Sequence, residues 1–174
     1  MVTVHGDHPF LPPESERSPV RRLRGRLGAA VTLWTSGSGP DRAGLTVASM
    51  LVADGDPGRV LGLLDPDSEL SDALAKGETF AVNVLAWSDR ALADAFAGVA
   101  PAPGGVFRLG AWTDTAWGPV LDTALAWAGC RLLPQTRQVG WSVLVEGEIA
   151  HVALRDDDSP ALLHRRGRYH RLGS

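Results

Sequence analysis

Hydrophobic positions follow two periods along the chain, and the change between them marks where helix gives way to strand. Val20, Leu23 and Leu27 recur at helical spacing among four arginines, and Ser18 followed by proline is a typical helix start. Gly28 is the expected stop. From residue 30 onward the pattern becomes rich in β-branched residues, so a short helix followed by strands is predicted.

The rest of the pattern predicts strands joined by turns, with two short helices between them. Runs of β-formers bounded by turn residues predict strands over 30–35, 43–53, 59–64, 79–85, 125–133 and 139–154, the first three as a β-meander. Amphipathic helices are predicted over 69–76 and 89–97, a long loop over 99–118, and a basic closing segment over 161–172. This order favours a mainly β fold, an antiparallel barrel decorated with short helices, because no regular βαβ alternation is present.

The chain length predicts a single globular domain behind an extended arm. At 174 residues the chain is long enough for one packed core. Pro9, Pro12, Pro13 and Pro19 exclude a long helix near the start, so residues 1–18 are predicted to be an arm and 19–174 the domain. Hydrophobic residues make up 44% and charged residues 21%, as is usual for globular proteins.

The net charge, the apolar runs and the cysteine count indicate which partners and which cellular compartment to expect. The net charge of −3 provides no field that would steer nucleic acid. No run approaches about 18 apolar residues, and the first residues lack a basic flank before an apolar run, so neither a membrane span nor a signal peptide is expected. Cys130 is the only cysteine, which fits a reducing compartment. The cytoplasm is therefore the expected location.

Several common site motifs are missing from the sequence. The glycine-rich stretch 37–44 lies between two predicted strands, so it indicates a hairpin turn and not a phosphate-binding loop before a helix. Neither H-E-x-x-H nor C-x-x-C nor G-x-S-x-G occurs. Cys130 lies in an apolar run, where a buried inert thiol is expected. No metal site and no covalent nucleophile are predicted.

Two segments carry chemical information. In 44–49 (G-L-T-V-A-S), small and hydroxyl side chains interrupt a strand, which would let a flat ring approach the backbone; the alternative is a half-buried strand with a wet face. In 164–171 (H-R-R-G-R-Y-H-R), four arginines could bind phosphates; the alternative is a solvated basic tail. The residues alone leave both alternatives open.

In order and spacing, these segments resemble the flavin reductase-like family, whose fold is the FMN-binding split barrel, a Greek-key-like antiparallel barrel. The resemblance runs from about residue 24 to residue 172. It rests on G-R-L before V-T-L-W-T, on G-L-T-V-A-S as the flavin strand, on F-A-V-N-V-L at 80–85, and on the closing segment 164–169.

The resemblance implies a homodimer that holds FMN, or FAD, at the subunit interface and takes hydride from NADH or NADPH. By position, the flavin contacts implied are Arg42, Gly44, Leu45, Thr46, Ala48, Ser49, Leu64, Asp65, Ser68 and Phe96, and the nicotinamide nucleotide would lie near His164, Arg165, Arg166 and Gly167. Hydride transfer between two stacked rings requires orientation and exclusion of side reactions, so no catalytic acid or base is expected.

The sequence also departs from the family pattern. Many of these reductases begin a late strand with an Asp-His pair, where this chain has Gly140, Trp141 and Ser142, and Leu70 stands where a second phosphate hydroxyl is expected. The leading hypothesis is an NAD(P)H-dependent FMN reductase, with or without a partner monooxygenase. A non-catalytic FMN-binding carrier or sensor is the alternative, and a flavin-free interaction module is a third.

Overall fold

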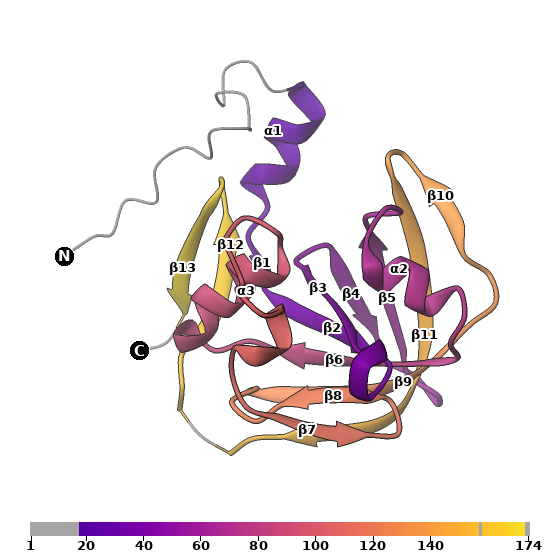
Figure 1. The fold of residues 1–174 in the computed structure, drawn as a ribbon. Coiled ribbons are helices and arrows are strands. Elements are labelled where there is room, and N and C mark those ends of the chain that lie inside the picture. Colours follow the sequence, from indigo (N-terminus) through magenta and orange to yellow (C-terminus); the bar gives the residue numbers. More distant parts are fainter. Residues whose placement is uncertain (1–17, 157, 173–174) are drawn as a thin grey trace.

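The computed structural model describes residues 18–156 and 158–172 (Figure 1). The predicted arm at 1–17 lies outside the described residues. The helical elements are α1 (Pro19–Arg26), α2 (Glu69–Leu74), α3 (Arg90–Phe96) and the 3-10 turns η2 (Gly39–Asp41), η3 (Trp87–Asp89) and η4 (Val106–Arg108). The strands are β1 (Ala29–Ala30), β2 (Thr32–Ser36), β3 (Ala43–Val47), β4 (Met50–Ala53), β5 (Arg59–Leu64), β6 (Thr79–Val84), β7 (Trp112–Thr115), β8 (Gly118–Leu121), β9 (Ala126–Leu132), β10 (Arg137–Val139), β11 (Ser142–Leu154), β12 (Ala161–Arg165) and β13 (Arg168–Leu172). No helix in these ranges is both long and apolar enough to cross a membrane.

A curled antiparallel sheet forms the body of the fold, as the sequence predicts. Its strand order is β3-β2-β6-β9-β11-β5-β4, with β10 paired to β11. Two smaller sheets lie against it, the hairpin β7–β8 and the group β1-β12-β13 (Figure 1). The mainly β, antiparallel barrel is therefore confirmed.

The predicted single strand over 43–53 is wrong, because the chain breaks it in two. β3 pairs with β2 at one end of the sheet, and β4 pairs with β5 at the other end. Ala48 and Ser49, which we call the seam, carry the chain from one end strand to the other. The Ser49 carbonyl accepts a hydrogen bond from the Leu63 backbone N–H at 2.9 Å. A continuous strand could not pair with both ends of the sheet, so the first three predicted strands are not one meander.

Two other predicted boundaries also change. The expected loop over 99–118 contains η4 and β7, and β7 pairs with β8. Phe107 and Trp112, which belong to this segment, pack against Phe96, with ring centroids 5.0 and 5.6 Å from the Phe96 ring. Burial of these rings orders the segment despite its Pro and Gly content. The strand predicted from residue 139 begins at Ser142, because the tip at Gly140, whose φ is +59°, turns the chain from β10 into β11.

The barrel interior is built around two stacked rings. Trp34 and Phe80 lie 4.9 Å apart at an interplanar angle of 13°, and both are fully buried. Gly62 and Gly147 leave room for them: a Cβ added at Gly62 would lie 2.5 Å from the Trp34 ring, and one at Gly147 would lie 2.5 Å from the Phe80 ring. The glycines of β5 and β11 therefore accommodate the aromatic core.

A second core lies between the outer face of the sheet, α3 and the hairpin β7–β8. Its buried members are Val31, Leu33, Leu85, Leu92, Ala93, Phe96, Leu121, Ala124 and Leu162. The Thr35 hydroxyl donates to the Pro119 carbonyl at 2.6 Å and ties the hairpin to β2. This second core fixes α3 over β3, which matters for the site.

Asn83 joins three strands through its side-chain amide and is fully buried. Its Nδ2 donates to the Leu33 carbonyl at 3.0 Å, and its Oδ1 accepts from the Leu121 backbone N–H at 2.9 Å. Asn83→Ala would leave both backbone groups buried without these partners, so we expect the free energy of unfolding to fall by about 2–4 kcal/mol. Urea unfolding followed by circular dichroism measures this loss. A fall below about 0.5 kcal/mol would contradict the assigned role.

Candidate functional site

The small residues of β3 face α3. A Cβ added at Gly44 would lie 2.6 Å from Cε1 of Phe96, and the Thr46 hydroxyl donates to the Ala93 carbonyl at 2.7 Å. The side chain of Leu45 points the other way and packs against the barrel core. Helix packing therefore accounts for the small side-chain face of the strand. The outer backbone edge of β3 has no neighbouring strand among the described residues, since β3 ends the sheet.

The seam brings two groups of predicted contacts together. Ala48 and Ser49 are half-buried, and the Ser49 carbonyl is bonded to Leu63 on β5. Leu64 follows directly, but its side chain is fully buried in the barrel core. Only the backbone of Leu64 can contact a ligand. The end of β3, the seam and the end of β5 thus form one continuous surface.

The turn after β5 is built from hydroxyl and carboxylate side chains. The Asp65 carboxylate accepts from the Asp67 backbone N–H at 2.9 Å, and the Asp65 carbonyl accepts from the Ser68 hydroxyl at 2.8 Å. Ser68 Oγ also accepts from the Ser71 backbone N–H at 3.2 Å and caps α2. Asp65 is exposed and Ser68 half-buried. Ser71, which sequence reasoning missed, offers a second hydroxyl 3.0 Å from Ser68 Oγ.

Arg42, another predicted contact, is held by its own chain. Its guanidinium Nη2 lies 2.7 Å from both carboxylate oxygens of Asp114 on β7 and over the Phe107 ring at 5.9 Å. Its Nε is buried without a hydrogen-bond partner. Asp114 lies 72 residues away in the predicted loop, so the sequence carried no signal for this pair. Arg42 must leave Asp114 before it can bind another anion through the same Nη2.

Phe96 is a core side chain in this structure. It is only 5% exposed and lies against Phe107, Trp112 and the α-carbon of Gly44. Sequence position alone placed it among the flavin contacts. In the structure it stands behind β3, where it supports the strand.

The closing hairpin β12–β13 carries the third predicted group, 164–167. Its turn contains Arg166 at φ +53° and Gly167 at φ +77°. The Arg166 backbone N–H donates to the Gly25 carbonyl at 2.7 Å, and Arg165 Nε donates to the Arg26 carbonyl at 3.3 Å, so the turn holds the end of α1. Arg165, Arg166 and Gly167 are exposed. In Figure 1, α3 stands between this hairpin and β3.

Asp94 on α3 connects the hairpin to the helix that packs on β3. Burial, together with a side-chain hydrogen bond to Asp94, raises the pKa of Tyr169 above its usual range. The His164 ring packs edge-on against Tyr169 at 5.9 Å. The adjacent residue, Ala93, accepts from Thr46. Helical periodicity could not identify the role of Asp94, because its hydrogen-bond partner Tyr169 lies far along the chain.

Electrostatics disfavour a charged His164. Burial lowers its pKa below 6.5, and the positive charges of Arg24 and His170 act in the same direction, whereas Asp94 opposes them. A histidine whose folded pKa is depressed makes its stability contribution above the unfolded pKa and loses it as pH falls. We therefore expect the free energy of unfolding to decrease as pH is lowered from 6.5 through the folded pKa. Urea unfolding at stepped pH should show a shallower decrease for His164→Gln; equal slopes would contradict this assignment.

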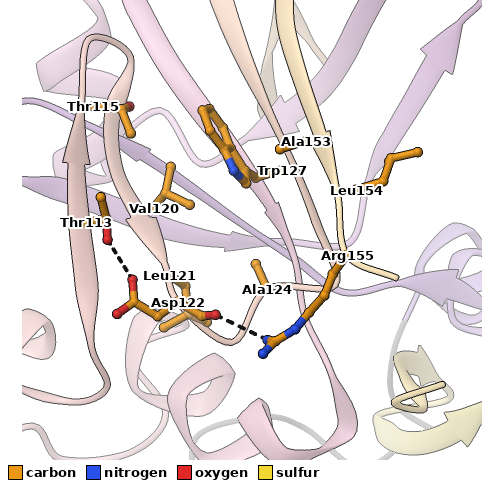
Figure 2. A pocket seen from close by; sticks show the side chains of 10 residues that line it. All are labelled: Thr113, Thr115, Val120, Leu121, Asp122, Ala124, Trp127, Ala153, Leu154 and Arg155. Atoms are coloured by element: carbon orange, nitrogen blue, oxygen red, sulfur yellow. Dashed lines mark hydrogen bonds between the residues drawn. The ribbon is translucent and has the colours of Figure 1, made fainter. Parts of the chain in front are cut away.

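Two cavities among the described residues include none of the predicted contacts in their walls. One of about 430 Å³ is walled by Trp127, Asp122 and Arg155, with Thr113 bonded to the Asp122 carboxylate at 2.9 Å (Figure 2). The other, of about 770 Å³, lies beside α2 and includes Pro66 and Ser71. Within the described ranges no cluster of His, Cys, Asp and Glu is suited to a metal ion. Burial raises the pKa of Cys130 to about 12, as expected for an inert thiol.

This geometry fits a flavin better than a metal or a nucleophile. The seam provides small, half-exposed residues beside the unpaired backbone edges of β3 and β4, and hydroxyls follow within the same surface. Amides at a sheet edge can bind the polar rim of a flat ring, and hydroxyls suit phosphate oxygens. A curled antiparallel sheet that stays open at this edge defines a split-barrel flavoprotein.

Comparisons with known proteins agree. The family model described as "Flavin reductase like domain" matches residues 24–173, and the chain belongs to this family. The FMN reductase (NADH) RutF of Pantoea ananatis is 33% identical over 159 residues, covering 90% of this chain and 82% of that protein. The NADH:FAD oxidoreductase SgcE6 of Streptomyces globisporus is 25% identical with a TM-score of 0.80, covering 94% and 96% of the two chains. BorF, the flavin reductase component of a bacterial two-component tryptophan halogenase, is 25% identical with a TM-score of 0.77, covering 89% and 99%.

Proposed function

We propose that this protein is an NADH-dependent flavin reductase that uses FMN, accepts FAD as an alternative, and supplies reduced flavin to a partner oxygenase. The main support for this proposal is the seam, where Ala48 and Ser49 meet the end of β5 beside an open sheet edge. Family membership and the NADH-dependent FMN reductases among the relatives support the activity. Bound flavin supplies the hydride acceptor, and the chain supplies binding and orientation.

The predicted contacts have different roles in this proposal. Ser49 and Ser68 act through side chains, and the edge strand around Gly44, Leu45 and Thr46 acts through its backbone. Arg42 and Phe96 support β3 from behind. Backbone amides at the seam would bind the pyrimidine edge of the ring, where negative charge develops on reduction. The segment 164–167 is the proposed nicotinamide nucleotide side, with exposed arginines available for its phosphates.

Anaerobic stopped-flow mixing of the purified protein with FMN and NADH tests the activity. Loss of the visible absorbance of oxidised flavin, faster than in a protein-free control, is the expected result. NADPH in a parallel series establishes which reductant is used. Flavin that stays oxidised with both nucleotides would contradict the reductase assignment.

A non-catalytic flavin-binding protein is the second candidate, and one observation favours it. Trp141 stands at the tip between β10 and β11, next to Ser142, where the family resemblance implies an Asp-His pair, and it is 94% exposed. A carrier would bind FMN tightly and quench its fluorescence without consuming NADH. Turnover measured at saturating FMN separates the two functions.

Two further proposals concern assembly and location. We propose a homodimer with flavin at its interface, because four of the large apolar side chains on β4, β5 and β11 are solvent-exposed in the single chain: Leu51, Val52, Leu63 and Val152. Size-exclusion chromatography with light scattering measures the mass.

We also propose a cytoplasmic location, since the single buried cysteine suits a reducing compartment; cell fractionation checks it.

A further inference from the structure

Helix α1 carries an apolar stripe that its own protomer leaves uncovered. Val20 and Leu23 lie on one face of α1, Leu27 follows directly as its extended C-cap, and the three side chains are 76%, 65% and 65% exposed. No residue of α1 is buried, and Figure 1 shows it standing clear of the barrel. The backbone hydrogen bond from Arg166 lies at its C-terminal end. An eight-residue helix is not stable alone in water, so this stripe needs a cover.

A matching apolar surface lies on the outside of the barrel. Leu51 on β4 stands opposite Leu61 on β5, and Leu63 stands opposite Leu144 on β11. These four side chains share one face, because their neighbours Val60 and Leu64 point into the core. Leu51 is 72% exposed and Leu63 36%. We call these four residues the outer leucine patch.

The charges beside the two apolar surfaces are complementary. Residues 18–28 contain four arginines and no carboxylate. Residues 60–75 contain Asp65, Asp67, Glu69 and Asp72 and no lysine or arginine, with Arg59 before them and Lys76 after them. Asp65 follows Leu63 by two positions, so the acidic segment begins at the margin of the outer leucine patch. Opposite charges at matching positions favour association and fix its register.

The same acidic segment leaves the proposed flavin site incomplete. Ser68 and Ser71 offer hydroxyls to the phosphate, but the adjoining carboxylates would repel a dianion. The segment itself contains no cation to balance them. Arg42, the one arginine among the implied flavin contacts, is paired with Asp114. A second copy of the chain can supply the missing charge.

We propose that α1 of one copy docks on the outer leucine patch of a second copy and brings Arg22 and Arg24 to the acidic segment, where they complete the flavin phosphate site of that copy. A two-fold axis makes the contact twice, so both sites are completed. The phosphate part of this inference rests on the proposed function; the docking part does not.

Charge reversal tests the docking. The variant R22E/R24E, in the full chain, is expected to run as a monomer at micromolar concentration where the wild type runs as a dimer. D67R/E69R is expected to dissociate likewise, and the four substitutions together are expected to restore the dimer. R90E/R108E is the matched control: it reverses the charge of two exposed arginines that lie outside α1, and it is expected to remain dimeric. Circular dichroism checks folding, which α1 should not affect because none of its residues is buried.

Flavin titration tests the phosphate contact. R22E/R24E is expected to weaken FMN binding at least tenfold relative to riboflavin, which has the same ring without the phosphate. A dimer that survives R22E/R24E, or a wild-type monomer that still reduces FMN, would overturn the docking and leave the function intact. If the fourfold charge swap restores the dimer but the wild type binds no flavin, the docking is supported and the function is overturned. An unchanged ratio of FMN to riboflavin affinity would overturn the phosphate role.

Discussion

Replacing Trp34 by alanine should lower the free energy of unfolding by about 3–5 kcal/mol, a large fraction of the stability of a domain this size. The indole is fully buried, stacks on Phe80, and donates from Nε1 to the Thr32 hydroxyl at 3.1 Å. Its removal leaves a large cavity in the barrel interior and takes the hydrogen-bond donor from a buried hydroxyl. Urea unfolding followed by far-ultraviolet circular dichroism measures the loss.

Trp141→Ala is the matched control, because it removes the same side chain from an exposed position. It should change the free energy of unfolding by no more than about 0.5 kcal/mol. A second check uses Gly62, whose added Cβ would enter the space of the missing indole. Gly62→Ala should therefore be less harmful in the Trp34→Ala background than in the wild type. Equal losses for the two tryptophans would refute the assigned core.

Gly44→Ala should destabilise the protein by about 1–3 kcal/mol. The new methyl group would lie 2.6 Å from the Phe96 ring and 3.3 Å from the Trp34 carbonyl, so either α3 or β3 must shift. Neither can move freely, since Thr46 bonds to Ala93 and Phe96 packs on Phe107. The same unfolding experiment measures the effect.

Phe96→Leu in the same chain separates packing from other causes. The smaller side chain should relieve the clash, giving a coupling energy of about 0.5–3 kcal/mol between the two substitutions. Additive losses would show that Gly44 is required for a reason other than its contact with Phe96. Thr113→Ala, which changes an exposed hydroxyl on β7, provides a nearby comparison expected to have little effect.

Much of the fold could be predicted because its signals are local. Ser18 and its proline start α1, β5 spans the predicted 59–64, and the antiparallel barrel follows from the order of strands and turns. The break at Ala48 and Ser49 was missed because these small residues suit a strand as well as a link, and only the pairing of both ends of the sheet decides between them. The hairpin β7–β8 was missed because burial of Phe107 and Trp112 outweighs local loop composition.

The candidate site was predicted less completely than the fold. Ser49 is bonded to Leu63 near the end of β5, and the turn with Asp65 and Ser68 follows that strand; their role as flavin contacts stays a prediction. Phe96 and the side-chain face of Gly44 instead pack against each other. Asp94 and Asp114 were not identified, because their partners Tyr169 and Arg42 are distant in sequence and no spacing rule connects them.

The seam has a consequence for how the barrel forms. The two strands at opposite ends of the sheet are consecutive in the chain, joined through only Ala48 and Ser49. Loop-closure entropy grows with the length of the loop, so bringing these two edges together costs very little once the hairpins β2–β3 and β4–β5 exist. The slow step of folding should then be the docking of β6, β9 and β11, which follow later in the chain and fill the sheet between two hairpins that are already tethered.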